Sequence, residues 1–596
     1  MANEKTVRVG NAGGYWGDDL DAFQRQLSMG PLDYLSLDFL AEITMSILQK
    51  QRARNPDMGY ARDFVDQVQR ALPYLSEGKT RVISNAGGIN PRGCARRIAE
   101  VAREAHVKLP IAVVEGDDLM DRLDELIQDG HKLANMETGQ ELASIRDKVQ
   151  SANAYLGAAP VIKALEMGGQ IIVTGRVTDT GITIAAPAFE FGWDLDDWDR
   201  LASAVIAGHI IECGAQASGG NLTDWHEVES FQRMGYPIVE VSSDGSFIVT
   251  KHEKAGGLVN EKTVSEQLVY EMGDPWEYIT PDVVAEFSSI RLQDLGDDRV
   301  RISGVRGRRR TESLKASISY HDGYKAQGTV IVSRPDAVEK CRAIEEIFFR
   351  RLGLDFEETR ANLVGYNACH QHLVEEHDPP EILLQIGVRD GDKGKVAEFS
   401  KQFPSVILST VPGVAIVGAR PRIQDVVAYW PCLLPADEVT PRVSLLDGEE
   451  SVSVGWTAPP VDDTAPDAPS PPGEEIPQAP QGPRQRMRLR HLAYARSGDK
   501  GNTCNIGVVA RSRPIYAFLQ RELTAAKVKE FFGDICQGQV ERFEVPNIKA
   551  LNFLLHESLG GGGTLSLGID PQGKTYAHAL LLMEIEAPRV LLDSLR

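Results

Sequence analysis

Short apolar runs alternate with longer segments of helical periodicity over the first 220 residues, and this alternation restricts the possible folds more than any other feature. The apolar runs, each of strand length, are residues 7–10, 34–40, 80–85, 111–116 and 170–175. The segments that place apolar side chains three and four positions apart, as one face of a helix does, are residues 60–78, 92–107 and 155–169. Strands and helices in this succession form right-handed βαβ units. The sequence therefore predicts an α/β body with a mainly parallel sheet flanked by helices.

A proline-rich, acidic segment divides the chain. Residues 458–484 contain almost no large apolar side chains, so burial could not offset the entropy of ordering them. We therefore predict an α/β core domain over residues 1–455, a linker over residues 456–486 and a C-terminal domain over residues 487–596. A linker of about 27 residues reaches several nanometres, so we expect the C-terminal domain to dock onto the body.

The pattern is weaker in the later part of the body. Apolar runs within residues 245–259 and 298–307 predict strands, and we expect a mixed α/β second lobe over about residues 225–455. Arg306, Arg308, Arg309 and Arg310 form the most basic patch of the chain. They could clamp a phosphate, but a hairpin turn that faces solvent explains them more simply.

Charge and composition exclude several classes of protein. The formal net charge of −21 argues against a nucleic-acid partner, because such binding depends on clustered cations. No apolar run approaches the roughly 18 residues that span a bilayer, and the first residues do not resemble a signal peptide. Seven widely spaced cysteines indicate neither a disulfide framework nor a zinc ribbon. We expect a cytoplasmic protein with reduced thiols and no membrane contact.

Glycine and polar side chains gather in the loops that follow four of the predicted strands. In a parallel sheet the loops after the carboxyl ends of the strands lie together and hold the ligand. Glycines there let backbone N–H groups approach an anion or oxyanion closely. Ordinary turn and cap chemistry would explain any one of these loops alone. The residues expected to share one rim are Asn11, Gly13, Gly14, Asp18, Asp19, Asn85, Gly87, Gly88, Asn90, Glu115, Asp117, Asp118, Arg176 and Asp179.

The sequence supports no nucleotide cofactor. The first glycine-rich loop would need glycine at position 12 to form a dinucleotide fingerprint, and that residue is Ala12. A P-loop motif is also missing. His370, His372 and His377 resemble a metal-binding tract, but their spacing matches no zinc-ligand pattern, so we expect a solvated loop and no metal.

One helical segment carries acid–base chemistry. His209, Glu212 and Cys213 lie at helical spacing and share one face. An imidazole beside a carboxylate suits proton transfer, so His209 and Glu212 are candidate catalytic residues. Cys213 could act as a nucleophile, but a lone helical cysteine is more typical of a buried apolar position.

The C-terminal domain contains a polar turn and a run of four glycines. Ser497, Asp499, Lys500 and Asn502 group at a turn between two predicted strands. Residues 551–559 are expected to form an amphipathic helix that ends in Gly560–Gly563 and is followed by a strand. Because a glycine run is costly unless the backbone needs positive φ or admits a ligand, Gly561 and Gly562 join the candidate binding residues.

These motifs together resemble one family. The stretches VRVGNAGGYWGDD, GRVTDTGITIAAPAFEFGW, GHIIECGAQASGGN, YARSGDKGNTCNIGVVAR and LHESLGGGGTLSLGID are similar to the acyclic terpene utilisation protein A (AtuA) family. The resemblance implies a large core domain and a C-terminal domain with a ferredoxin-like α+β fold. It also implies a metabolic setting, the breakdown of acyclic terpenoids, in which acyl-CoA thioesters are the intermediates. It implies no catalytic residues.

We expect a lyase or hydratase that acts on an acyl-CoA or related carbonyl compound without a cofactor. Asp18, Asp19, Asp179, His209 and Glu212 are the candidate proton-transfer residues, the glycines of the strand-end loops are candidate N–H donors for an enolate oxygen, and Arg176 is a candidate anion contact. Two alternatives remain open, a non-catalytic binding or assembly subunit and a thioester hydrolase. The expected partners are a small-molecule substrate, a CoA thioester among the candidates, and further copies of the same chain.

Overall fold

The computed structural model describes residues 5–40, 42–374, 377–458 and 481–593. Most of the predicted linker, residues 459–480, lies outside the described residues. No helix of the described part is long and apolar enough to cross a membrane. All seven cysteines are free thiols.

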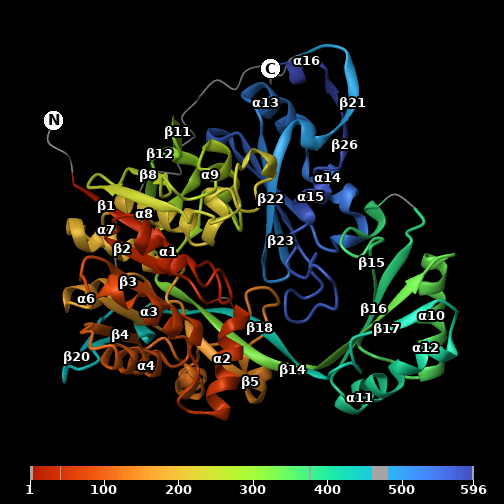
Figure 1. Cartoon of the computed structure of the whole chain (residues 1–596), viewed down its shortest axis with the longest axis horizontal. Helices are drawn as coiled ribbons and strands as arrows, with labels where there is room; N and C mark the ends of the chain where they lie inside the picture. Colours follow the sequence, from red (N-terminus) through yellow and green to blue (C-terminus); the bar gives the residue numbers. More distant parts are fainter. Residues whose placement is uncertain (1–4, 41, 375–376, 459–480, 594–596) are drawn as a thin grey trace.

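An eleven-stranded sheet forms the centre of the body (Figure 1). Its middle strands pair in parallel in the order β1 (Thr6–Asn11), β2 (Tyr34–Leu37), β3 (Arg81–Ser84), β6 (Ile171–Thr174) and β4 (Ile111–Glu115). Each of the five coincides with one of the predicted apolar runs. The predicted α/β fold with a mainly parallel centre is therefore confirmed.

Helices cover both faces of this sheet. On one face, α1 (Ala22–Met29), α3 (Arg62–Leu75) and α4 (Pro91–Glu104) pack on Val82, Ile171 and Val173. On the other face, α6 (Ala159–Glu166), α7 (Gly181–Phe191) and α8 (Trp198–Ile211) pack on Ile83 and Ile172. Because successive residues of a strand point to opposite faces, a strand between two helical layers needs a continuous apolar run. That requirement explains the pattern of the sequence.

Antiparallel strands extend the sheet at both edges. Beyond β1 the order is β7 (Ile238–Ser242), β8 (Phe247–Thr250), β12 (Arg299–Ser303) and β11 (Arg291–Gly296). Beyond β4 follow β19 (Arg442–Leu445) and β20 (Ser451–Ser453). The expected second lobe is therefore smaller than residues 225–455, because both ends of that segment pair with the first sheet.

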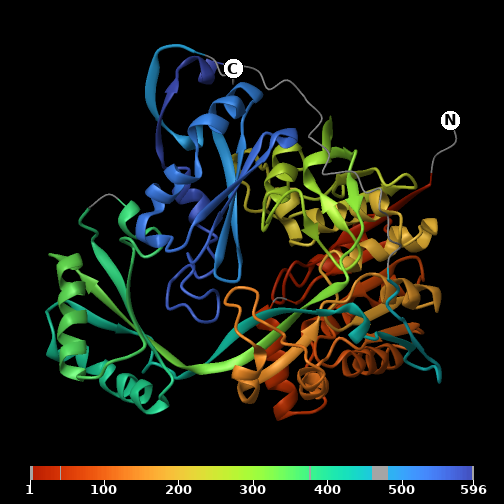
Figure 2. The ribbon, with the colours of Figure 1, turned by 180° about the vertical axis from the view of Figure 1, so that it is seen from behind.

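One strand of 21 residues, β14 (Ser313–Ser333), connects the body to a separate lobe (Figures 1 and 2). Its first part pairs with β5 (Val149–Ala154) and β18 (Gln424–Pro435) beside the body. Its later part pairs with β16 (Glu381–Asp390) and β17 (Val414–Val417), and β15 (Glu358–Val364) completes the lobe sheet. Helices α10 (Ala337–Leu352) and α11 (Lys393–Gln402) close the core of the lobe.

The C-terminal module, residues 484–593, has an antiparallel sheet in the order β22 (Ala493–Lys500), β23 (Thr503–Ala510), β25 (Ala550–Leu555) and β24 (Val540–Val545). Helices α13 (Arg513–Glu522) and α14 (Ala525–Phe532) belong to the same core. The expected amphipathic helix before the glycines is wrong, because its apolar residues form the inner strand β25. No strand follows Gly563 before β26 (Glu584–Pro588), which pairs with β21 (Arg484–Arg488).

The module docks on the body through its sheet, as expected. Tyr494, Val509 and Ala550 belong to the same apolar cluster as the body helices α7 and α8. Gly507 allows close contact, since a Cβ there would lie 2.2 Å from the Cβ of Val269. The docking residues of the module therefore belong to the apolar core of the body, while the module keeps a separate core with α13 and α14.

Candidate functional site

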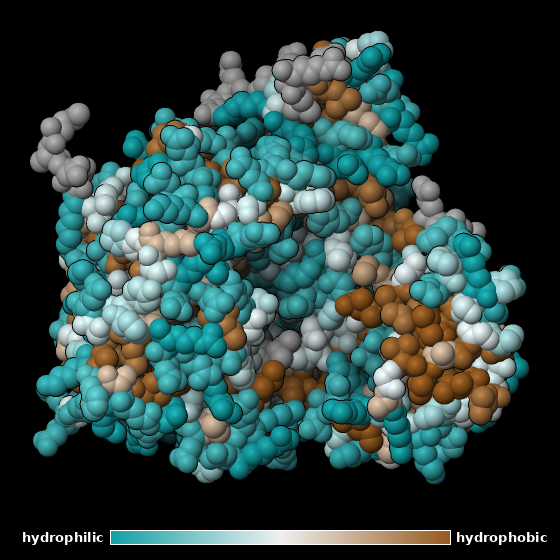
Figure 3. Space-filling model, in the orientation of Figure 1, coloured by the Kyte–Doolittle hydropathy of each residue, from teal (hydrophilic) through white to brown (hydrophobic). Residues whose placement is uncertain are grey.

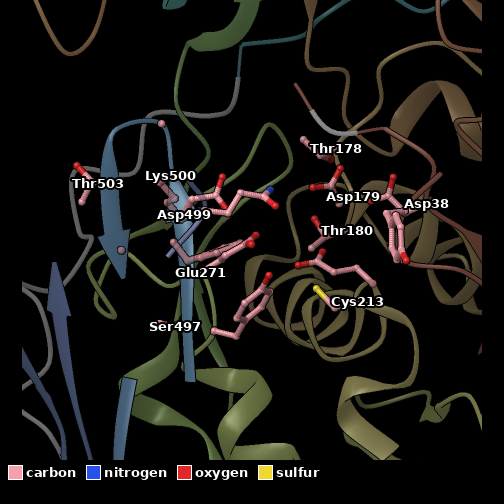
Figure 4. Close-up of a pocket in the computed structure, with 18 of the residues that line it drawn as sticks. Asp38, Thr178, Asp179, Thr180, Cys213, Glu271, Ser497, Asp499, Lys500 and Thr503 are labelled. Carbon is pink, nitrogen blue, oxygen red and sulfur yellow. The ribbon is translucent and has the colours of Figure 1, made fainter. Parts of the chain in front are cut away.

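A cavity of about 1960 Å³ lies between the body and the C-terminal module, and the strands β14 and β18 form part of its wall. Figure 3 shows the molecule hollowed near the centre of this face. In Figure 4, Asp38, Thr178, Asp179 and Thr180 of the body face Asp499 and Lys500 of the module across the cavity. The volume exceeds the roughly 300–1,000 Å³ of a site for a drug-sized ligand, so the cavity has room for a large substrate.

Three carboxyl groups from different loops meet on the body side of the cavity. Asp38 directly follows β2, Asp179 lies in the loop between β6 and α7, and Glu212 caps the C-terminal end of α8. The negative charge of Asp179 acts on both other groups and raises their pKa. We refer to Asp38, Asp179 and Glu212 as the carboxyl cluster.

A buried arginine holds one member of this cluster. The Arg176 side chain is 3% exposed, and its Nη2 lies 3.0 Å from Asp179 Oδ1. Its Nη1 donates to the carbonyl of Leu40 at 2.7 Å, and its guanidinium lies 4.2 Å from the ring centre of Tyr155. These contacts fix the guanidinium, so Arg176 presents a positioned positive charge beside Asp179.

The surroundings of Asp38 and Glu212 raise the pKa of both carboxyl groups. Burial, followed by the charge of Asp179, holds the pKa of Asp38 well above its ordinary value, although Asn85 and the amide of Leu40 donate to the carboxyl. The pKa of Glu212 is also held well above its ordinary value, mainly by burial and next by the negative charges of Asp179 and Glu271. A carboxyl group whose pKa is raised by burial and by a neighbouring negative charge is suited to act as a general acid.

His209 supports Glu212 from behind the cavity wall. Its Nδ1 lies 3.1 Å from Glu212 Oε1, and its ring packs edge-on against Tyr278 and Phe287. Burial, with a smaller effect of Lys500, lowers the pKa of His209 to about 4. The imidazole is therefore neutral at physiological pH. Since His209 does not line the cavity, it positions Glu212 and does not contact a ligand there.

The module contributes a charged network to the opposite wall. Lys574 Nζ lies 3.0 Å from both Glu271 and Asp499, and it donates to the hydroxyl of Tyr270 at 2.6 Å. Burial alone would lower the pKa of Lys574, but Glu271, Tyr270 and Asp499 raise it overall. This network joins a body loop to the module, so it holds the cavity closed on that side.

Several polar groups in the wall have no partner within the protein. Glu212 Oε2 and the hydroxyls of Thr178 and Thr180 are buried and form no hydrogen bond with any described residue. The Tyr278 hydroxyl also forms none of the hydrogen bonds found in the described part of the chain. Buried polar groups are otherwise nearly always paired, so Glu212 Oε2 and the hydroxyls of Thr178 and Thr180 are suited to a ligand.

Sequence comparison connects this site to a known family. Residues 7–445 match the acyclic terpene utilisation family protein AtuA, and residues 487–586 match the AtuA ferredoxin-like domain. The chain belongs to the AtuA family. No curated protein matches it significantly. Among solved structures, the crystal structure of E. coli aspartokinase III in complex with aspartate and ADP is 10% identical over 92% of this chain and 96% of that chain. Its TM-score of 0.18 is too low to indicate a shared fold.

In this AtuA protein, part of the predicted rim lines the cavity. Gly14, Asp18, Arg176, Asp179 and Glu212 come from the body, and Ser497, Asp499, Lys500 and Asn502 come from the module. Gly14, Asp18, Ser497 and Asn502 form hydrogen bonds within the protein. Asp18 accepts from the Gly14 amide and the Tyr236 hydroxyl, and Asn502 accepts from the Gly561 amide. The Ser497 hydroxyl donates to the carbonyl of Gly573 and accepts from the amide of Ala577. Gly561 and Gly562 take positive φ and fold around the turn at Asn502.

Other predicted residues lie outside the cavity lining. Asp19 pairs with Arg25, Glu115 pairs with Arg92, and Asn90 caps α4. Asn11 exchanges hydrogen bonds with Gly13 inside its own loop. Asn85 donates to Asp38 and therefore acts on the carboxyl cluster indirectly.

Three of the four strand-end glycines that were expected to be oxyanion donors use their N–H groups within the protein. The N–H groups of Gly13, Gly14 and Gly88 already donate to Asn11, Asp18 and Asn85. Gly87 is needed for packing, since a Cβ there would lie 2.5 Å from the carbonyl oxygen of Thr174. These glycines shape the loops through internal hydrogen bonds and close packing.

Two aspartates of the predicted rim stabilise the fold beside the site. Asp117 accepts from the amide of Arg176 and from Asn153, and burial raises its pKa to about 6. Asp118 is half-exposed and lies 3.9 Å from Arg52. Among the described residues, no group of three or more His, Cys, Asp or Glu side chains has the geometry to hold a metal ion.

Sequence analysis missed Asp38, Glu271 and Tyr278. Asp38 had a signal, because it is the single acid of an apolar run and follows a strand as the other rim residues do. Glu271 and Tyr278 lie between α9 (Glu261–Leu268) and β10 (Val284–Glu286), where no periodicity marks them. Cys213 lines the cavity, but burial and Glu212 hold the pKa of its thiol well above the ordinary value, which disfavours the thiolate.

Proposed function

We propose that the protein is an enzyme that adds water to, or removes water from, an acyl-CoA or related carbonyl intermediate of acyclic terpene utilisation, without a redox cofactor. The family supplies the metabolic setting. The single observation that carries the reaction type is the carboxyl cluster with Arg176 at the cavity wall.

Two members of the carboxyl cluster are suited to different roles, one as a base and the other as an acid. Asp179, ion-paired with Arg176, is the carboxylate that takes a proton from the carbon next to the carbonyl. Glu212, which keeps its proton because it is buried, donates that proton to the leaving hydroxyl group. In the hydration direction the two roles are reversed. Neighbouring carboxyl groups whose environments favour different protonation states are the usual mark of paired acid–base catalysis.

The enolate oxygen needs hydrogen-bond donors, and two side chains are suited to supply them. Burial, then Glu212 and Asp179, hold the pKa of Tyr278 well above its ordinary value, so its hydroxyl stays protonated and can donate. The ammonium of Lys500 lies 6.0 Å from the centre of the same ring. Donors that are already oriented in a dry site stabilise a developing oxyanion strongly.

The test is a turnover screen with enoyl-CoA and 3-hydroxyacyl-CoA thioesters of linear and branched acyl groups. We expect Asp179→Asn and Glu212→Gln to lower turnover by about 100-fold or more. Asp19→Asn is the matched control, because Asp19 is another carboxylate of a strand-end loop but lies outside the cavity. An enzyme whose turnover is equally sensitive to all three substitutions would not use the cluster. Absence of turnover, with a stable complex formed in native cells, would favour an assembly subunit instead.

Thioester hydrolysis is a second candidate, favoured by a separate group at the edge of the cavity. Thr503 Oγ1 lies 3.2 Å from His556 Nδ1, and His556 Nε2 lies 3.0 Å from Glu541 Oε2. This order of hydroxyl, imidazole and carboxylate is the one that activates a nucleophile. The Thr503 oxygen would attack the thioester carbonyl, with its proton passing through His556 to the departing thiol of coenzyme A, and water would then hydrolyse the acyl–threonine ester to the free acid. Release of coenzyme A that Thr503→Val abolishes, with Asp179→Asn still active, would identify this reaction.

A further inference from the structure

The wall formed by β14 and β18 carries a lysine with unusual neighbours. Lys315 pairs in register with Leu433, so both side chains point to the same face, and both line the cavity. Lys315 Nζ lies 5.3 Å from the ring centre of Tyr155 and 5.6 Å from that of Tyr429. Aromatic faces stabilise a partly desolvated ammonium group. They leave its N–H donors available to a hydrogen-bond acceptor.

Lys315 differs from most cations of the cavity because it has no carboxylate partner. Arg176, Arg496 and Lys574 each lie within 3.0 Å of a carboxylate oxygen. No carboxylate of the described residues lies within 4.0 Å of Lys315 Nζ, although acidic side chains outnumber basic ones in the lining. An unpaired ammonium in an acidic cavity is a site for an anion supplied by a ligand.

The position of Lys315 limits what that anion can be. The guanidinium of Arg176 stacks on the same ring of Tyr155, and Arg176 holds Asp179. Lys315 is therefore linked to the carboxyl cluster through the ring of Tyr155 and the guanidinium of Arg176. The phosphates of coenzyme A are separated from its thioester by the whole pantetheine arm. A carboxylate on the acyl group fits the short separation better.

An apolar surface lies beside the lysine. Leu433 is 50% exposed and Met136 is 56% exposed, and both line the cavity together with Pro431. Large apolar side chains that remain this exposed inside a cavity gain free energy when a ligand covers them.

We propose that Lys315 binds a carboxylate that the substrate carries close to its reacting carbon, while an apolar chain of the same substrate covers Met136 and Leu433. The proposal rests on the proposed function for the identity of the reacting carbon. It assigns the substrate class as acids with an apolar chain and a free carboxylate in addition to the reacting carbonyl group.

Calorimetric binding to the full chain tests this assignment with octanoate and octanamide, which share one chain and differ in charge. We expect the wild type to bind octanoate at least tenfold more tightly than octanamide. Lys315→Met should abolish that preference, and Lys315→Arg should keep it. Lys163→Met is the matched control, because Lys163 lies on α6 outside the cavity lining, and it should keep the preference.

The binding experiment needs no turnover, so it remains informative if the proposed reaction is wrong. Equal affinities for the two probes in the wild type, or an octanoate preference that survives in Lys315→Met, would overturn the proposal. A loss of coenzyme A affinity in Lys315→Met with octanoate binding unchanged would also overturn it, because the anion would then be a phosphate. Lys315→Gln gives a second removal of the charge if Lys315→Met does not fold.

Discussion

Replacement of Arg496 by methionine should loosen the C-terminal module from the body. Arg496 Nη2 lies 2.8 Å from Glu266 Oε2, and the two side chains are 6% and 0% exposed. The guanidinium also donates to Gln216 and to the carbonyl of Gly220 at 3.2 Å. Methionine keeps much of the volume but leaves the Glu266 carboxylate buried, and among the described residues its remaining donor is the amide of Thr223, at 3.0 Å. Breaking a buried ion pair on one side costs about 3–5 kcal/mol.

A loss of about 4 kcal/mol corresponds to a shift of roughly 1,000-fold in the docking equilibrium. Hydrogen exchange followed by mass spectrometry measures this shift in the peptides that contain α9 and β22, since local opening sets their exchange rates. The control is Arg486→Met, which removes an exposed pair with Glu584 and should cost about 0–1 kcal/mol.

The double variant Arg496→Met/Glu266→Leu should recover most of the loss, because no unpaired charge remains. If exchange in Arg496→Met equals that of the Arg486→Met control, apolar contacts alone hold the module. The reasoning from the buried ion pair would then be refuted.

Three further substitutions test other parts of the structure. Burial raises the pKa of Asp282 from 3.8 to about 6, so the stability associated with this group is present below pH 4 and is lost as pH rises through 6. Asp282→Asn should therefore gain about 3 kcal/mol relative to the wild type between pH 4 and pH 7, measured by urea unfolding at each pH, and parallel profiles would contradict it. Tyr278→Phe should lower kcat while KM changes little, because an oxyanion donor acts in the transition state; an effect on KM alone would assign Tyr278 to binding. Gly507→Ala places a methyl group against Val269 and should lower the melting temperature of the full chain, whereas an unchanged value would show that the contact can relax.

The sequence predicts the central sheet because each strand is buried on both faces and therefore has an uninterrupted apolar run. It also predicts Arg176 and Asp179, since the loop after β6 must lie at the carboxyl edge of the sheet. The sequence pattern did not separate Asp38 from the strand, because the apolar run continues past Leu37, where β2 ends. Glu271 reaches the site through contacts with Lys574, more than 300 residues away, and local periodicity cannot reveal such a pairing.

Residues 551–555 show the same limit in the fold. The hydropathy of this short run suits one face of a helix as well as a strand, and only the partners β23 and β24 decide between them. The glycines of the first loops were recognised as special for a sound reason, the need for close backbone approach. The partners of that approach are other segments of the protein, since a Cβ at Gly14 would lie 2.6 Å from the backbone of Cys213 and one at Gly87 would lie 2.5 Å from the carbonyl oxygen of Thr174. No sequence pattern distinguishes such a partner from a ligand.

The docking of the module has a consequence during protein synthesis. A ribosome completes the α/β body before it makes Lys500 and Lys574, so a nascent chain holds the carboxyl cluster in a cleft open to water. Burial is the largest cause of the raised pKa of Glu212, and side chains of the module line the same cavity as Glu212. The wall that carries Lys500 and Lys574 is therefore added only when translation is nearly complete, and a product of early termination lacks that wall even when its body is folded.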